Sequence, residues 1–367
     1  MFIETVLERL GENVTLAMLG VLLGFAFGFM AQRSRFCLRS AVIEFARNLT
    51  GGKLTVWLFA FATAVLATQW LALTGAFDAR DARQIAARGS LSGAAIGGAL
   101  FGIGMILARG CSSRLLVLAA QGNLRSVMSG LVFAVTAQAA WTGMLAPLRT
   151  AISEWWTVDG GVSRDLIART GIGHGGALAF GAVWLAAAVF WARRQRVPAW
   201  GWAGAIGVGL TIAAAWWATF AISRLSFDPH PIQALSFTGP SAELLTRVLF
   251  AGDKPPTFDL GLVPGVFLGA FVAAALFGEL KLEGFHDGAS MRRYIVGAVC
   301  MGFGGMLAGG CAVGAGLSGA AVFTITSWVT LCAMWAAAAL TDRLVDRPGF
   351  VALDQPMPGA APAAHAA

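Results

Sequence analysis

Long apolar stretches follow one another along most of the chain, separated by short polar connections. Nine of these stretches contain no Asp, Glu, Lys or Arg. A helix needs roughly 20 apolar residues to cross a hydrocarbon core about 30 Å thick, and the nine stretches approach that length. They cover residues 13–31, 55–75, 91–108, 126–146, 174–192, 200–223, 262–278, 295–308 and 322–340. The pattern predicts an all-α polytopic membrane protein with about nine transmembrane helices.

The overall composition agrees with a protein whose solvent is lipid. Of the 367 residues, 57% are hydrophobic and 12% are charged, which lies outside the range of soluble globular domains. We therefore expect residues 1–354 to form a single transmembrane domain in contact with membrane lipid. Residues 355–367 are rich in Pro and Ala, which is typical of a disordered tail.

The net charge of +7 has a simpler explanation than nucleic-acid binding. Cytoplasmic loops of membrane proteins carry an excess of Lys and Arg, and the basic residues here lie in the connections between apolar stretches. Of the 26 Lys and Arg, 16 follow odd-numbered stretches, which leaves 10 for the other side. This bias predicts a bacterial inner-membrane protein with its N-terminus outside, its C-terminus in the cytoplasm and no nucleic-acid partner.

An internal repeat is visible around two of the cysteines. Residues 97–111 (GGALFGIGMILARGC) and 297–311 (GAVCMGFGGMLAGGC) align without gaps at an offset of 200, with seven of fifteen positions identical. The copies belong to the third and eighth stretches, so they face opposite sides of the membrane. The pattern predicts an inverted repeat with halves 13–146 and 200–342 and a connecting helix at 174–192. Transporters built in this way bind substrate at the interface of the repeats.

Four polar or glycine-rich segments, each after an apolar stretch, interrupt the predicted helices. They are residues 32–47 and 109–122 in the first half and 226–250 and 309–321 in the second. Non-helical backbone at membrane depth must be buried in protein or line a polar cavity. The N-terminus of a half-helix also presents free N–H groups to an anion. We interpret the four segments as re-entrant half-helices, two from each side, that mark a substrate pathway.

Three of the five cysteines, Cys37, Cys111 and Cys311, lie at these breaks. Cys300 and Cys332 lie within apolar stretches, where we expect small buried hydrophobic residues. The chain has no C-x-x-C motif and no His or carboxylate at metal-ligand spacing beside the cysteines, so we expect neither a metal nor another cofactor. Packing explains most lone cysteines, but three at matching breaks favour a function.

Other residues at the breaks complete the candidate pathway. Close helix packing explains the glycines upstream of each Gly-Cys motif, whereas the glycines beside the cysteines are expected to line the path. Four arginines at the mouths would guide an anion. The full set of predicted pathway residues is Cys37, Cys111, Cys311, Gly110, Gly309, Gly310, Arg35, Arg39, Arg109, Arg114, Ser236 and Thr238.

At these positions the sequence resembles the YeeE/YedE family of membrane proteins, which includes thiosulfate uptake transporters. The resemblance rests on RSRFC at 33–37, RGC at 109–111, SFTGP at 236–240 and GGCAVG at 309–314, and it extends over roughly residues 13–342. It implies an hourglass-like fold in which three cysteines line a central path, with Cys111 as the first candidate for an indispensable one. A small cytoplasmic sulfur-carrier protein is the implied acceptor.

The resemblance leaves the substrate open within sulfur chemistry. Family members handle several sulfur species, and some are linked to selenium metabolism. The residues after the second cysteine, Ser112, Ser113 and Arg114, are more polar and more basic than the glycine-rich continuation that the family leads us to expect.

Thiosulfate suits such a pathway because it has hard oxygens and a soft terminal sulfur. Helix N–H groups can bind the oxygens and thiols can donate weakly to the sulfur, so we expect the anion to pass from thiol to thiol without a covalent bond. Two negative charges that enter against about 100 mV cost roughly 4.6 kcal/mol. The apolar stretches hold no carboxylate for a proton relay, and the chain has no P-loop sequence. We therefore expect facilitated uptake drawn by a cytoplasmic acceptor, and no enzymatic activity.

Two alternatives are open at the level of sequence. In one, the protein is a membrane sulfurtransferase or sulfur-sensing subunit, in which a cysteine passes sulfur covalently to a partner. In the other, it is a channel for a different small solute and the cysteines only pack. A trapped sulfur adduct would indicate the first, and flux that survives Cys-to-Ala substitution would indicate the second.

Overall fold

The computed structural model describes residues 9–48, 51–226, 230–250, 255–284 and 288–346. Within these ranges the regular structure is helical apart from one antiparallel pair of two-residue strands, β1 (Gly89–Ser90) and β2 (Thr157–Val158). The predicted all-α class is confirmed. The tail at 355–367, for which we predicted disorder, lies outside the described residues.

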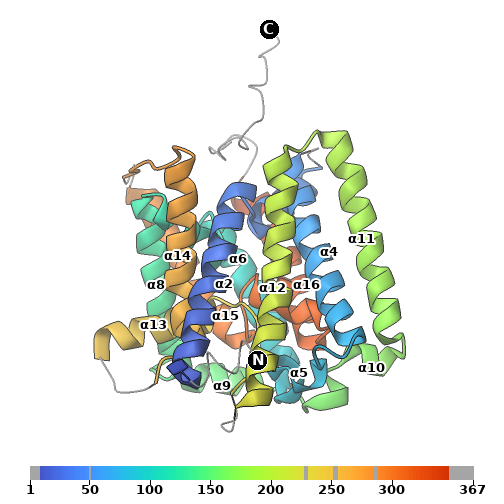
Figure 1. The fold of residues 1–367 in the computed structure, drawn as a ribbon. Helices are drawn as coiled ribbons and strands as arrows, with labels where there is room; N and C mark the ends of the chain where they lie inside the picture. Colours follow the sequence, from blue (N-terminus) through green and yellow to red (C-terminus); the bar gives the residue numbers. More distant parts are fainter. Residues whose placement is uncertain (1–8, 49–50, 227–229, 251–254, 285–287, 347–367) are drawn as a thin grey trace.

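Long helices stand side by side, and several of the short helices lie toward the lower end of the bundle (Figure 1). The long helices are α2 (Glu12–Ser34), α4 (Gly52–Leu73), α6 (Leu91–Leu107), α8 (Leu124–Trp141), α11 (Gly173–Gln195), α12 (Ala199–Leu225), α14 (Phe258–Leu276), α15 (Gly288–Leu307) and α16 (Ile325–Val345). The shorter helices are α3 (Leu38–Ala46), η1 (Ala79–Asp81), α5 (Arg83–Ala86), α7 (Ser112–Ala120), α9 (Ala146–Glu154), η2 (Gly161–Ser163), α10 (Leu166–Thr170), α13 (Thr238–Phe250) and the π-helical turn η3 (Gly314–Gly319).

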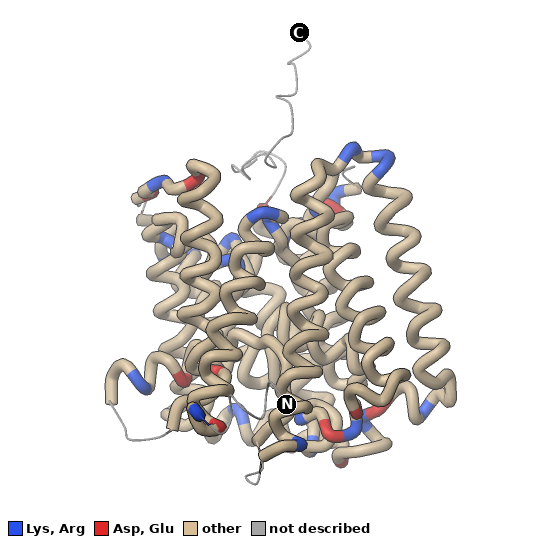
Figure 2. The backbone as a smooth tube through the Cα atoms, in the orientation of Figure 1, with Lys and Arg blue, Asp and Glu red and all other residues tan. Residues whose placement is uncertain are grey.

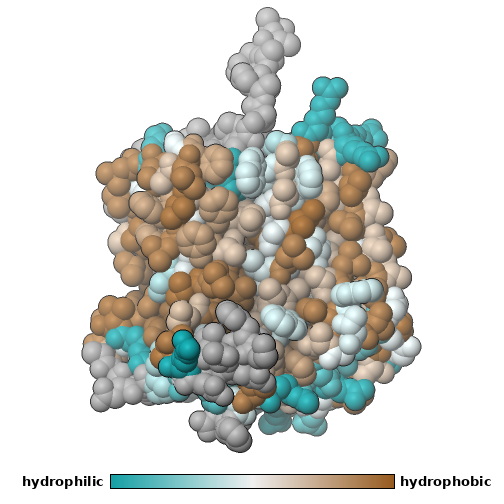
Figure 3. Space-filling view, in the orientation of Figure 1, coloured by the Kyte–Doolittle hydropathy of each residue, from teal (hydrophilic) through white to brown (hydrophobic). Residues whose placement is uncertain are grey.

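The bundle has the surface of a membrane protein. Lys, Arg, Asp and Glu gather at its two ends (Figure 2), and an apolar surface covers most of the visible face between them (Figure 3). Seven apolar helical stretches in the described residues are long enough to cross a membrane, and α8 with α9, which meet at a bend of 65°, can add an eighth. The predicted stretch at 295–308 lies in α15. The chain is a polytopic membrane protein, while the count of nine spans stays a prediction.

Each of the four predicted breaks contains a short helix, but two of them differ from the expected course. The sequence led us to expect that 32–47 and 109–122 turn back into the membrane. In the structure α2 and α3 together form one apolar stretch, Glu12–Ala46, and α6 and α7 form another, Leu91–Ala120. We therefore describe α2–α3 and α6–α7 as interrupted helices, in which the short helix continues from the long one.

Glycines allow α6 and α15 to cross in close contact. A Cβ atom added to Gly97 would lie 2.5 Å from the amide nitrogen of Ala308, and one added to Gly297 would lie 2.5 Å from that of Ala108. No side chain fits at either position, because real Cβ atoms do not approach backbone so closely. The close-packing interpretation of these upstream glycines agrees with this geometry.

The contacts at this crossing exchange under an offset of 200 residues. Gly97 meets Ala308 as Gly297 meets Ala108. Beside the crossing, Gly102 meets the backbone of Met334 in α16, and Gly302 meets that of Phe133 in α8, which is one residue away from the same offset. An inverted repeat would produce such an exchange, and we keep the halves 13–146 and 200–342 as a proposal that these contacts support. The single-domain interpretation of 1–354 likewise stays a prediction.

Candidate functional site

Three breaks share one backbone design. Arg35, Arg109 and Gly309 each adopt the left-handed conformation, with φ of 53°, 57° and 75°, two residues before Cys37, Cys111 and Cys311. Each ends the preceding helix, and the N–H of the following residue bonds back across the last turn: Phe36 to Ala31, Gly110 to Met105 and Gly310 to Gly305. This is the hydrogen-bond pattern of a helix C-terminus. Cys37 and Cys111 then stand where the next helix begins, and Cys311 stands three residues before η3.

Cys37 and Cys111 belong to the two breaks of the first half, and their side chains lie together. Cys37 is the N-cap of α3 and Cys111 is the N-cap of α7. Their thiols are in hydrogen-bond contact, and the Cys111 Sγ lies 3.4 Å from the Ser113 Oγ. Both side chains are buried, with 6% and 0% exposed. Two helix N-termini with their free N–H groups therefore meet at one pair of thiols.

Cys311 belongs to a different group of contacts, in the second half. Its Sγ accepts a hydrogen bond of 3.4 Å from the N–H of Gly314, at the start of η3. Gly314 packs against Ser236, so closely that a Cβ atom on the glycine would collide with the serine side chain. Ser318 of η3 donates a hydrogen bond of 2.7 Å to the carbonyl of Leu235. The segment before α13 and the turn after Cys311 thus form one unit.

The fourth break has an aromatic residue in place of a thiol. Phe237, at an offset of 200 from Cys37, precedes α13 and packs against Phe27 with the two rings tilted by 45° and their centroids 5.3 Å apart. Next to it Thr238 is 2% exposed, and its Oγ1 has no hydrogen-bond partner in the described part of the chain. A buried hydroxyl without a partner is a candidate for binding a ligand.

An open cavity of about 560 Å³ leads to this second-half unit. Predicted pathway residues line its inner wall, namely Ser236, Thr238, Gly309 and Gly310. Sequence reasoning missed the arginines that line it elsewhere, which are Arg83, Arg88, Arg149 and Arg164. α5 and α9, which carry two of these arginines, lie at the lower end of the bundle (Figure 1).

One of these arginines is held rigidly. Arg164 is 7% exposed and donates a hydrogen bond of 2.7 Å to the Thr326 Oγ1, and another to the carbonyl of Ala87. Burial lowers the pKa of Arg164 to about 10, so its guanidinium stays positive at neutral pH. The cavity therefore keeps a fixed positive charge next to its polar wall.

A signal for the cavity was present in the sequence. The first loops on the predicted outer side carry Arg80, Arg83, Arg88, Arg149 and Arg164, although the positive-inside rule leads us to expect few basic residues there. The positive-inside rule does not explain these arginines, so their number in these loops could have indicated a functional role on that side. Asp259, which also lines the cavity, could not be assigned to it from sequence.

The predicted arginines at the mouths divide into paired and unpaired ones. Arg35 pairs with Glu279 at 3.4 Å, and Arg39 pairs with Asp346 at 3.5 Å. Arg109 and Arg114 form no ion pair among the described residues, and the Arg114 Nη1 is buried without a hydrogen-bond partner. Arg35 and Arg39 are therefore engaged with carboxylates, and the guiding role of the four arginines stays a prediction.

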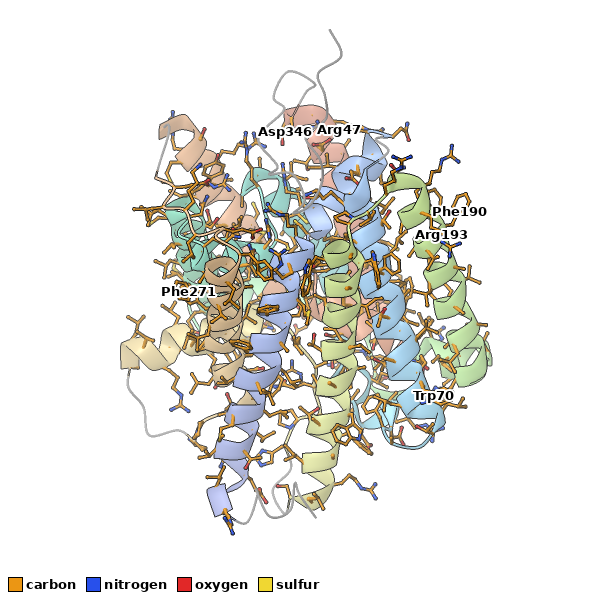
Figure 4. All side chains as sticks on the ribbon, turned by 45° about the horizontal axis from the view of Figure 1, so that its top comes forward. Arg47, Trp70, Phe190, Arg193, Phe271 and Asp346 are labelled. Carbon is orange, nitrogen blue, oxygen red and sulfur yellow. The ribbon has the colours of Figure 1, made fainter. Side chains whose placement is uncertain are left out.

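Ion pairs join the elements at the end of the bundle opposite to the cavity. Asp346 accepts a hydrogen bond of 2.7 Å from Arg293, and its carbonyl accepts one of 2.7 Å from Arg47. Arg47 also bonds to both carboxylate oxygens of Asp342, at 2.7 and 2.8 Å. Asp346 and Arg47 lie side by side at the end that comes forward in Figure 4.

The remaining cysteines differ from expectation. Cys332 is exposed and Cys300 is half-buried, so the prediction that both are buried is wrong. An apolar helix in a membrane has one face toward protein and one toward lipid, and composition alone does not tell which face a residue occupies. Within the described ranges no group of three or more His, Cys, Asp or Glu is arranged to hold a metal ion.

Comparison with known proteins gives one family and two relatives. A family model described as sulphur transport matches residues 33–340. The thiosulfate transporter TsuA of Spirochaeta thermophila is 28% identical over 326 residues, which cover 84% of this chain and 93% of that protein. The thiosulfate transporter TsuA of Escherichia coli is 26% identical over 350 residues, which cover 86% of this chain and 90% of that protein.

Proposed function

Because this chain belongs to the sulphur-transport family, whose model matches residues 33–340, we propose that it carries thiosulfate or a closely related sulfur anion into the cytoplasm. Membership makes it a membrane transporter for a sulfur compound. The substrate, the direction and the location in the bacterial inner membrane are parts of the proposal. The names of the two TsuA relatives support thiosulfate as the substrate.

The observation that carries the proposal is the pair of buried thiols at two helix N-termini. Cys37 and Cys111 are in contact at the starts of α3 and α7. Free N–H groups there can bind the oxygens of thiosulfate, while the thiols are weak donors suited to its soft terminal sulfur. Sulfate has no soft atom, so the thiols would distinguish the two anions.

We propose an order of events along the bundle. The arginine-lined cavity concentrates anions at the outer side, because a positive cleft raises the local concentration of negative substrates. The anion next reaches Ser236, Thr238 and the glycines before Cys311, which form the inner wall of that cavity. It then passes to Cys111 and Cys37, beyond which Arg35 and Arg114 lie toward the cytoplasm.

This direction depends on the predicted orientation, with the start of α2 outside. Inward movement of a dianion against about 100 mV costs roughly 4.6 kcal/mol. A cytoplasmic sulfur-carrier protein that consumes the anion would supply that free energy by keeping its internal concentration low. The hourglass form implied by the family resemblance would place the thiols at the constriction.

Contact between the thiols of Cys37 and Cys111 also supports the sulfurtransferase alternative. The Cys111 thiolate would attack the terminal sulfur of thiosulfate, the S–S bond would break, and sulfite would leave with the bonding electrons. The product would be a persulfide on Cys111. Mass spectrometry of protein incubated with thiosulfate would detect the added sulfur atom.

Uptake of radiolabelled thiosulfate by proteoliposomes tests the proposed function. We expect wild type and Cys332→Ala to take up thiosulfate, since Cys332 is exposed and away from the breaks. Cys111→Ala should lose at least about 90% of the rate, which corresponds to about 1.4 kcal/mol, and unlabelled sulfate should compete weakly. Uptake by Cys111→Ala at the wild-type rate would contradict the thiol pathway and favour the channel alternative.

A further inference from the structure

A carboxylate occupies a cluster of buried donors at the end of α2. The Glu279 Oε2 accepts a hydrogen bond of 2.6 Å from the Gln32 Nε2, and the Oε1 lies 3.1 Å from the Arg33 Nη1 and 3.4 Å from the Arg35 Nη2. Gln32, Arg33 and Arg35 are 0%, 3% and 8% exposed. Glu279 reaches these donors from the loop after α14, and its side chain is 17% exposed.

The cluster has more positive than negative charge. Arg33 and Arg114 lie close enough to Arg35 for their charges to act on it, and Glu279 is the acidic group that acts on it in the opposite sense. Arg114 has no ion pair among the described residues. Among the described residues, Arg33 and Arg35 therefore bond to the Glu279 carboxylate, and Arg114 adds a third positive charge nearby.

One of the donors, Arg33, is also held by contacts that do not involve the carboxylate. The guanidinium of Arg33 lies over the ring of Phe277, 3.5 Å from its centroid, and 5.4 Å from that of Trp200. A cation over an aromatic ring is attracted by the ring's negative face. These contacts would keep the Arg33 guanidinium in place when the carboxylate leaves.

The cluster stands directly beside the thiol pair. Arg35 precedes Cys37 by two residues, and Arg114 follows Cys111 by three, at the start of α7. Glu279 lies on the loop after α14, which is cytoplasmic in the predicted orientation. An anion that moves from the thiols toward the cytoplasm would therefore meet these cations.

We propose that Gln32, Arg33, Arg35 and Arg114 form an inner binding site for a sulfur oxyanion, and that Glu279 fills it as a tethered anion when no substrate is bound. The inference rests on the proposed function and extends it. A sulfonate group presents acceptor oxygens to the same donors that the Glu279 carboxylate uses. The arriving dianion displaces Glu279, and the return of Glu279 releases the dianion to the cytoplasm. Without such a competitor, three guanidinium groups would retain the substrate.

Equilibrium binding tests the site without transport. Purified full-length protein in the Cys111→Ala background is titrated with radiolabelled sulfate and, separately, with radiolabelled thiosulfate. Glu279→Gln keeps a similar shape and removes the competing charge, so it should bind both anions about tenfold more tightly. Glu283→Gln is the matched control, because Glu283 lies on the same loop and bonds instead to Asn123 and Lys281. Glu279→Asp should restore the wild-type affinity.

Two further measurements separate this site from a structural role of Glu279. In the Cys111-containing protein, Glu279→Gln should lower both the KM and the maximal rate of thiosulfate uptake, because release becomes slower. The gain in affinity should disappear in the double variant Glu279→Gln with Arg114→Gln. Binding that is unchanged or weaker in Glu279→Gln, or equally tight in Glu283→Gln, would overturn the inference. If sulfate binding tightens as expected while wild type takes up no thiosulfate, the inner site stands and the proposed substrate does not.

Discussion

The breaks before Cys111 and Cys311 have the same backbone and different chemistry. Arg109 and Gly309 occupy equivalent left-handed positions and end their helices with the same hydrogen bonds. Glycine adopts this conformation readily, whereas another residue there costs of order 1–3 kcal/mol. At the first break Arg109 has this conformational cost, and its guanidinium provides a positive charge there. The common backbone places a cysteine at a helix start, and the residues around it determine what each break does.

The residues three positions after the two cysteines, Arg114 and Gly314, also differ in size and charge. Arg114 lies close to Arg35 in the first half, while Gly314 packs tightly against Ser236 in the second. The residue three positions after the cysteine is small and uncharged at the second-half break, whereas at the first-half break it is an arginine. In the proposed direction, an anion passes from a site of hydroxyl and N–H groups to a site of guanidinium groups.

The largest effect should come from filling the crossing that positions both breaks. Gly97→Ala and Gly297→Ala each add a Cβ atom 2.5 Å from an amide nitrogen of the facing helix, so each should destabilise the protein by about 1–3 kcal/mol. Gly130→Ala is the control, since nothing lies within 4 Å of its Cβ position. Thermal unfolding in detergent should show similar losses for the first two. A loss of stability in only one of the two variants would contradict the proposal that the two halves are equivalent.

Replacing Arg109 by glycine, the residue at the equivalent position of the second break, should raise the stability of the protein while it lowers transport. Arg109→Gly relieves the left-handed strain and should raise the free energy of unfolding by about 1 kcal/mol, while thiosulfate uptake falls about tenfold through the lost cation. Gly309→Ala should lower stability by a similar amount, because alanine is strained at that φ. Both quantities can be measured on the same purified samples. Faster uptake by Arg109→Gly would show that its charge hinders the anion.

The smallest effect is expected at the outer cavity. Arg149→Gln removes one of several charges that line it, so we expect the KM for thiosulfate to rise about threefold with an unchanged maximal rate. The difference from wild type should shrink at high salt, because salt screens exposed charges. Initial uptake rates at two ionic strengths check this. A lower maximal rate with an unchanged KM would instead place Arg149 at a later step.

Sequence reasoning was strongest where a pattern is local. The apolar stretches predicted the membrane helices, and the match between 97–111 and 297–311 pointed to the two segments that cross through Gly97 and Gly297. The position of the three cysteines at helix breaks could also be predicted, because glycine or charge interrupts the apolar run just before each one.

Features that depend on distant residues could not be predicted. Arg35 meets Glu279, and Arg39 meets Asp346, across more than 200 positions of chain, and nothing local indicates either partner. The exposed Cys332 shows the same limit, since an apolar run does not reveal which of its faces meets lipid. The contact between Cys37 and Cys111 likewise arises only when the fold brings the starts of α3 and α7 together.

Thiosulfate labelled separately at its two sulfur atoms tests most directly whether the anion passes the thiols intact. Proteoliposomes receive either sulfane-labelled or sulfonate-labelled thiosulfate, and the internal label is measured over time. Intact passage predicts equal rates for the two labels and no label on the washed protein. Sulfane label held on the protein, with the sulfonate label left outside as sulfite, would contradict passage from thiol to thiol and establish covalent transfer in its place.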